Sequence, residues 1–124
     1  MTTAWDQSTP IYQQLRDRTV ASILDGHLQE GDLLPSVRQV AIDLQVNPIT
    51  VSKAYQMLVD EALVVPERGI GMRIKMGAKD QLLQDERSQF LQHDWPQILD
   101  RIQQLNLSWD ELPLPQPNKK AGNS

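Results

Sequence analysis

Apolar residues recur at three- and four-residue spacing along three early segments of the chain, and this pattern predicts three helices. The first covers residues 10–25, because Pro10 suits the first helical position and Gly26 is a common residue just past a helix end. The second covers residues 36–44 and the third covers residues 48–61. The first half of the chain is therefore expected to be helical.

The second and third helices also carry local signals for where they begin. Ser36 and Gln39 have the spacing of a capping box, in which the two side chains satisfy free amides at the helix start. Asn47 is a favoured N-cap, and Pro48 stands at the first helical position. Only about two residues would turn the chain between the helices, so the pair is expected to form a helix-turn-helix.

A β-hairpin is predicted after the third helix. Residues 63–67 are rich in strand formers, and residues 72–76 alternate apolar with basic side chains. The turn between them contains Gly69 and Gly71. With residues 31–35 expected as a loop, the order predicts a mainly α fold with a small hairpin: a winged helix-turn-helix.

Large apolar residues return at roughly helical spacing beyond residue 77, and they predict a helical segment over residues 78–112. Pro96 either kinks one long helix or starts a second one. Ser108 and Glu111 suggest a capped single turn, and residues 113–124 are expected to be disordered. The apolar stripe either packs on its own winged domain or forms a dimer interface. The candidate interface residues are Leu82, Leu83, Phe90, Leu91, Trp95, Ile98, Leu99, Ile102 and Leu105.

The second helix of a helix-turn-helix enters the major groove of DNA, where polar side chains bond base edges and an apolar one can touch a thymine methyl. The alternative for residues 48–61 is an ordinary solvated helix face. The hairpin turn would contact phosphate or sugar, although its glycines are equally explained by a tight turn. The candidate DNA-contacting residues are Ser36, Arg38, Asn47, Pro48, Ile49, Thr50, Ser52, Lys53, Gln56, Arg68, Gly69 and Gly71.

Composition narrows the function classes without deciding between them. The 124 residues suffice for one compact domain with an appendage, and no apolar run approaches the length of a membrane span. The net charge of −4 counts mildly against nucleic-acid binding, although residues 36–75 hold five basic against four acidic residues. The chain has no cysteine, and His27 and His93 lie far apart. We therefore expect no enzymatic activity, no metal and no cofactor.

The string LLPSVRQVAIDLQVNPITVSKAYQMLVDEALVVPERGIGMRI strongly resembles the winged-helix domain of GntR-family bacterial transcription regulators. PIYQQL and NPITVSKAY look like the YtrA-like subfamily, and the resemblance covers about residues 9–77. It implies a homodimer that binds double-stranded operator DNA, usually as a repressor. Ile49 departs from the polar residue common at that place. The family's motif positions fall on Pro35 and Arg38, on Asn47, Pro48, Thr50 and Lys53, and on Arg68, Gly69 and Gly71.

The sequence thus favours a cytoplasmic, sequence-specific regulator of transcription that acts as a homodimer on an operator. Whether a small effector binds, and whether the protein represses or activates, stay open. The alternative is a winged-helix module that binds another protein and no DNA, for which the net negative charge speaks.

Overall fold

The computed structural model describes residues 5–115, so most of the tail expected to be disordered lies outside the described residues. The chain divides into an N-terminal unit, Met1–Glu86, and a C-terminal unit, Arg87–Ser124. Among residues 5–115, no helix combines the length and the apolar character needed to cross a membrane.

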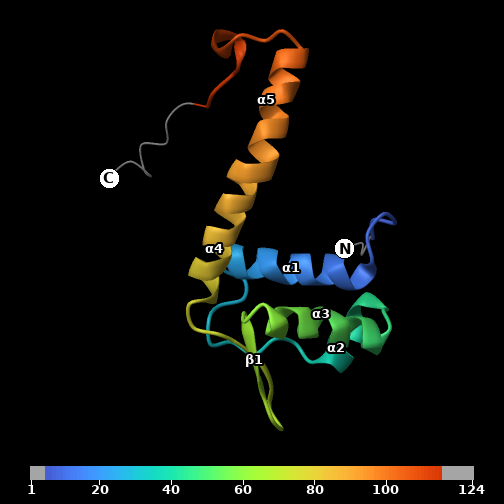
Figure 1. The fold of residues 1–124 in the computed structure, drawn as a ribbon. Helices are drawn as coiled ribbons and strands as arrows, with labels where there is room; N and C mark the ends of the chain where they lie inside the picture. The colour runs from blue at the N-terminus through green and yellow to red at the C-terminus, as the bar shows by residue number, and fades with distance from the viewer. Residues whose placement is uncertain (1–4, 116–124) are drawn as a thin grey trace. The chain divides into compact units, whose positions relative to one another are not determined.

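The N-terminal unit has the predicted order of elements. Three helices, α1 (Ile11–Asp25), α2 (Val37–Leu44) and α3 (Pro48–Asp60), precede the strands β1 (Val64–Glu67) and β2 (Gly71–Ile74). The strands pair antiparallel, and Val64 stands opposite Ile74. In Figure 1, α1 lies alongside α3 and the hairpin extends away from the helices. The expected winged helix-turn-helix is confirmed, with the second strand ending at Ile74 instead of residue 76.

A single apolar core holds these elements together. The inward face of α3 contributes four side chains, each no more than 3% exposed, and α1 adds three more. Burying a large aliphatic side chain stabilises a fold by about 1.5–3 kcal/mol, so this core supplies most of the driving force. The buried residues are Leu15, Val20, Ile23, Leu34, Ala41, Val51, Ala54, Tyr55, Leu58, Leu63, Val64, Ile74, Ala78 and Leu82.

Residues 31–34, expected as part of a loop, instead pair with β2. The N–H of Gly31 donates to the Ile74 oxygen at 2.8 Å, and the N–H of Leu34 donates to the Met72 oxygen at 2.8 Å. A bridge between Leu33 and Arg73 lies between these two bonds. The pairing satisfies backbone groups along the second edge of β2, which a two-stranded hairpin would leave open.

The first compact unit also continues past residue 77, where the resemblance to the winged domain ends. Helix α4 (Ala78–Gln89) begins there, and Ala78 is 1% and Leu82 2% exposed in the core. Leu82 was expected at an interface between two copies of the chain. It is instead buried within one copy, because the first turns of α4 pack against the core of the winged fold.

Two polar contacts fix the beginning of α4. The carboxylate Oε2 of Glu30 accepts from the N–H of Lys79 at 3.0 Å, which caps the free end of the helix. The amide Nε2 of Gln81 donates to the Glu61 carbonyl oxygen at 2.9 Å, just past α3. Hydrogen bonds to backbone amides lower the pKa of Glu30.

In the C-terminal unit, helical backbone passes through Pro96. A π-helical turn, η1 (Phe90–Asp94), leads into α5 (Trp95–Gln104), and the N–H of Trp95 bonds the oxygen of Phe90 five residues earlier. A proline ring clashes with the carbonyl four residues before it, and a wider π turn relieves that crowding. The short 3₁₀ helix η2 (Trp109–Glu111) has the predicted capping box with Ser108.

Two residues past the end of α3, the chain has a left-handed residue that is not glycine, and its substitution should change stability. Ala62 has φ 61°, and the N–H of Leu63 returns to the Leu58 oxygen at 2.9 Å. An L-residue in that region is strained, whereas glycine is not. We expect Ala62→Gly to raise the free energy of unfolding by about 0.5–1 kcal/mol, measured by urea denaturation.

The control is Ala21→Gly, at an exposed position inside α1. There glycine loses helix propensity and should lower stability by about 1 kcal/mol. If both substitutions destabilised the protein equally, the strain at Ala62 would be absent.

Candidate nucleic-acid interface

The outward face of α3 is set by how the helix begins and by what it buries. The Asn47 side-chain oxygen Oδ1 accepts from the N–H of Ile49 at 2.8 Å, and Pro48 follows the cap. Val51, Ala54, Tyr55 and Leu58 face the core. Six α3 residues are expected to contact DNA. Thr50 is half-buried, and the other five are exposed: Pro48, Ile49, Ser52, Lys53 and Gln56.

Tyr55 connects the buried face of α3 to the segment that precedes α2. Its hydroxyl donates to the Pro35 carbonyl oxygen at 2.7 Å, and the residue is 3% exposed. Burial raises the pKa of Tyr55 to about 12. The bond thereby fixes α3 against the start of α2, so the two helix N-termini are held in one arrangement.

The start of α2 presents two of the candidate contacts. Ser36 caps the helix, and its hydroxyl accepts from the N–H of Gln39 at 3.1 Å. The Gln39 side chain donates to Asp43 at 2.7 Å and does not reach back to Ser36, so only one half of the expected capping box forms. Ser36 and Arg38 are both exposed.

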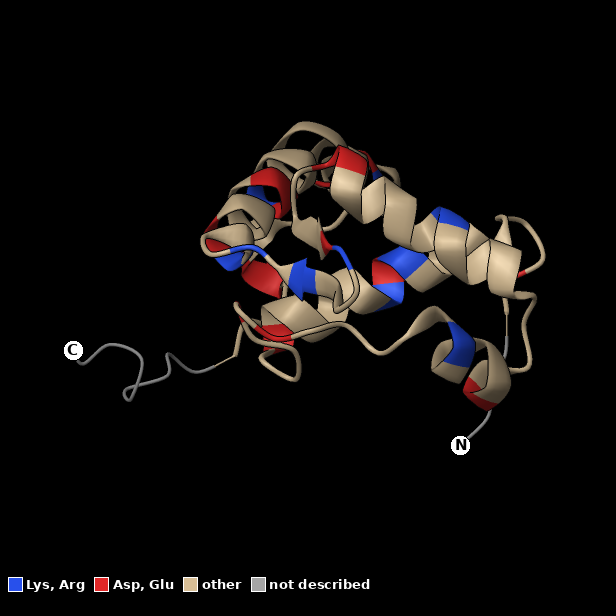
Figure 2. Cartoon of the chain, turned by 90° about the horizontal axis from the view of Figure 1, so that it is seen from below, with Lys and Arg blue, Asp and Glu red and all other residues tan. Residues whose placement is uncertain are grey.

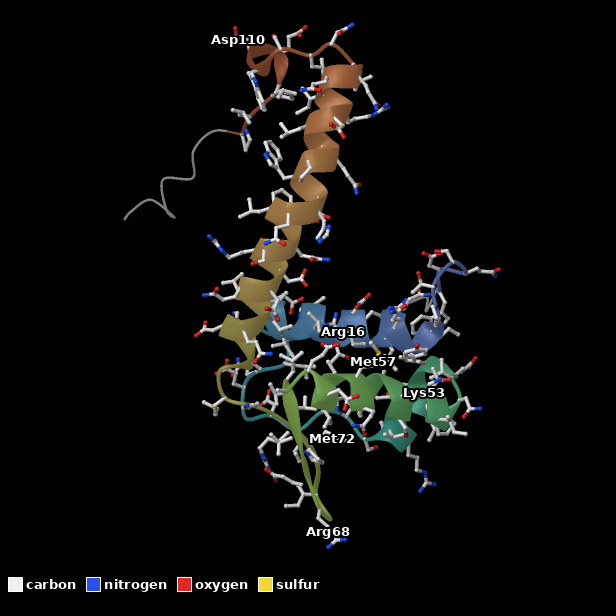
Figure 3. The ribbon with its side chains drawn as sticks, viewed as in Figure 1. Arg16, Lys53, Met57, Arg68, Met72 and Asp110 are labelled. Atoms are coloured by element: carbon white, nitrogen blue, oxygen red, sulfur yellow. The ribbon has the colours of Figure 1, made fainter. Side chains whose placement is uncertain are left out.

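Several polar groups expected to read bases are already engaged within the chain. The cap uses the Asn47 oxygen, and the Gln56 amide Nε2 donates to Asp60 at 2.9 Å. The Lys53 ammonium lies 4.6 Å from the centroid of the Tyr12 ring, a cation–π contact to α1. Lys53 is labelled on α3 in Figure 3. Each of these side chains therefore already has a partner within the chain, although both amides keep further donor or acceptor positions.

The hairpin turn places Arg68 at its tip (Figure 3). The N–H of Ile70 closes the turn on the Glu67 oxygen at 2.9 Å, and Gly69 has φ 78°, a conformation that glycine adopts without strain. Arg68 is exposed, and no acidic side chain of residues 5–115 forms an ion pair with it. Its guanidinium is therefore available to an external anion.

Glu67 and Arg73 form a bidentate pair across the hairpin. The guanidinium reaches the two carboxylate oxygens at 2.6 and 3.0 Å, and its remaining nitrogen donates to the Gly31 oxygen at 2.7 Å. Hydrogen bonds from Arg73 lower the pKa of Glu67. The Glu67 charge beside the turn is thus compensated, and Arg73 is committed to holding the hairpin against residues 31–34.

A groove of about 430 Å³ separates the hairpin from the start of α2. It brings together Ser36, Arg68, Gly69 and Gly71, four of the predicted contacts from two separate elements. Figure 2, which views the unit from the hairpin end, shows basic and acidic positions interspersed along the ribbon. The basic residues among the predicted DNA contacts, Arg38, Lys53 and Arg68, belong to three separate segments: α2, α3 and the hairpin turn.

Sequence reasoning missed the partners of these side chains. The contact of Lys53 with Tyr12 joins residues from two helices, and the Glu67–Arg73 pair requires the strand register to be known. The local pattern along one helix carries no signal for such contacts between separate elements.

Among residues 5–115, no cluster of His, Cys, Asp and Glu side chains could hold a metal ion.

The chain is similar to known bacterial regulatory proteins. The sequence model of the family "Bacterial regulatory proteins, gntR family" matches residues 10–74, more than half of the chain. The HTH-type transcriptional repressor YtrA of Bacillus subtilis is 43% identical over 77 residues, which are 62% of this chain and 59% of that protein. The chain thus matches less than two thirds of that relative's length.

Two further relatives match most of the chain. The regulator YhcF of Bacillus subtilis is 28% identical over 112 residues, covering 90% of this chain and 91% of that protein. The structure of a GntR family transcriptional regulator from Listeria monocytogenes is 28% identical with a TM-score of 0.72, covering 86% of this chain and 92% of that one. The similarity therefore continues beyond the winged fold into the C-terminal segment.

The buried hydroxyl of Tyr55 generates a pH prediction. Its pKa is about 12 in the fold against 10.0 for an ordinary tyrosine, so the unfolded chain releases this proton at lower pH. The stabilising contribution is complete below pH 10 and is lost as the pH rises toward 12. We expect Tyr55→Phe to remove this alkaline loss, measured by urea unfolding across that range.

At neutral pH the same variant should lower the free energy of unfolding by about 1–2 kcal/mol, because the Pro35 oxygen loses its donor. Tyr12→Phe is the control, since it removes a hydroxyl from the half-buried tyrosine of α1. An alkaline loss that persists in Tyr55→Phe would contradict the assignment.

Proposed function

The chain belongs to the gntR family of bacterial regulatory proteins, and from this premise we propose that it is a sequence-specific DNA-binding regulator of transcription. The observation that carries the proposal is the exposed outward face of α3, a helix that packs against α2 and leads into the hairpin. The protein then occupies an operator as a homodimer and acts as a repressor. Operator binding places its action in the cytoplasm, where the bacterial chromosome lies.

In this mechanism α3 enters the major groove and its first turns meet base edges. Arg38 and the capped start of α2 lie against the phosphate backbone, while Arg68 contacts phosphate or sugar from the hairpin. These contacts position the protein, and base contacts supply the sequence preference. The protein has no catalytic role in this scheme.

Electrostatics make the non-specific affinity low. The chain carries a net charge of −4, Arg73 is paired with Glu67, and Lys53 lies on Tyr12. Each phosphate neutralised adds about 0.9 to the salt slope of binding, so few free cations mean a shallow slope. Discrimination then depends on base contacts more than on charge.

Dimerisation is proposed for residues 78–112, alongside DNA binding by residues 9–77. None of the described residues of the C-terminal unit is buried. Its aromatic rings stack in a short series: the ring centroids of Phe90 and Trp95 lie 6.4 Å apart, and those of Trp95 and Trp109 also lie 6.4 Å apart. A helical unit with this much uncovered apolar surface needs a partner, and a second copy supplies one. The proposed interface residues are Leu83, Phe90, Leu91, Trp95, Ile98, Leu99, Ile102 and Leu105.

A second candidate function is a winged-helix module that binds a protein and no DNA. It is favoured by the exposed apolar side chains Ile42, 60% exposed, and Ile70, 61% exposed, together with the net negative charge. DNA selection with the full chain distinguishes the two functions. Recovery of no preferred duplex from a random pool would support the protein-binding function.

The role of Arg68 is tested on the duplex recovered by that selection. We expect Arg68→Ala to weaken binding about three- to tenfold and to lower the salt slope by about 1, because one phosphate contact is lost. Fluorescence anisotropy at several salt concentrations measures both quantities. The control is Lys79→Ala, which removes an exposed cation from α4. Equal losses of affinity in the two variants would show that the loss comes from the change in net charge and not from a contact made by Arg68.

The dimer is tested by placing a charge among the apolar residues of η1. Phe90, 44% exposed, contacts Trp95, and Phe90→Asp would bury a carboxylate in the proposed interface. We expect a shift from dimer to monomer at micromolar concentration in sedimentation velocity. The control, Gln92→Asp, places the same group at an exposed polar position of that turn. A wild-type chain that sediments as a monomer would contradict the proposal directly.

A further inference from the structure

Ile49 is the most exposed large apolar side chain of α3, at 68%. It lies in the first turn of the helix, and its own N–H is bound by the Asn47 cap at 2.8 Å. The cap fixes the backbone at this residue, and a β-branched side chain in a helix has little freedom at χ1. Ile49 therefore presents its methyl groups to solvent in a defined direction, on the face proposed to meet the major groove.

The neighbouring amides are poorly placed to replace it as base readers. A bidentate contact to adenine needs both the oxygen and the nitrogen of one amide group. The oxygen of Asn47 is bound in the cap, and the nitrogen of Gln56 is bound to Asp60 at 2.9 Å. Each amide keeps its other donor and acceptor positions, but the internal hydrogen bond restrains how it can turn toward a base, whereas the side chain of Ile49 has no polar contact to restrain it.

The major groove offers one exposed apolar group for such a side chain, the C5-methyl of thymine. We infer that Ile49 reads this methyl, so that each operator half-site carries a thymine recognised through apolar contact. The inference rests on the proposed function, because it assumes that α3 meets the major groove. A contact of one methyl group corresponds to about a fourfold change in affinity.

The experiment replaces single thymines with deoxyuridine, which lacks the methyl and keeps the pairing edge. The duplex is the one selected by the wild-type chain, and binding is measured for wild type and Ile49→Ala. At one thymine in each half-site, wild type should lose about three- to fivefold in affinity. Ile49→Ala should bind the thymine and deoxyuridine duplexes equally at that position.

Ile42→Ala is the matched control, because Ile42 is 60% exposed on α2 and the substitution removes the same atoms. This variant should keep the full sensitivity of wild type to the methyl group. Since Ile49 is largely exposed, its alanine variant should fold normally, which circular dichroism checks.

The possible results distinguish failure of the methyl recognition from failure of the proposed DNA binding. If wild type selects a duplex and no thymine shows the loss, or if Ile49→Ala keeps the same loss, the methyl readout is overturned and DNA binding stands. If wild type selects no duplex, both are overturned. Loss of the methyl effect in Ile49→Ala alone, with Ile42→Ala unchanged, supports the assignment.

Discussion

The burial of one face of α3 is the constraint on which the proposed DNA interface depends. Val51, Ala54 and Leu58 are completely enclosed, and Tyr55 adds a hydrogen bond to the Pro35 oxygen. Rotating α3 about its axis would expose these apolar groups and take the Tyr55 donor away from the Pro35 carbonyl. The outward direction of the opposite face is therefore fixed by the interior. Substitutions on that outward face can change the side chains without changing the direction in which they point.

Features encoded by neighbouring residues could be predicted from the sequence. The inward face of α3, its Asn47 cap and the hairpin follow from spacing, cap chemistry and turn glycines, and all three form as expected. Pairings between distant segments could not be predicted. The strand-like pairing of residues 31–34, the burial of Leu82 and the contact of Lys53 with Tyr12 all depend on tertiary packing.

The same division applies to the candidate interface. Residue types and spacing indicated which side chains face outward, but not which of them already have partners. Asn47, Gln56 and Lys53 each hold an internal contact, so a residue type suited to base recognition is not by itself an available group. Arg68 and Ile49 keep their side chains uncommitted among the described residues, one charged and one apolar. The surface thus combines sparse charge with exposed hydrocarbon.

The cap on α4 has a mechanical consequence. Glu30 accepts from the amide of Lys79, and the very next residue, Gly31, donates to Ile74 in β2. Glu30 and Gly31 are adjacent, so a rotation of the first turn of α4 would strain both the cap and the pairing of residues 31–34 with β2. The orientation of that first turn and the position of the hairpin are thereby coupled within the N-terminal unit.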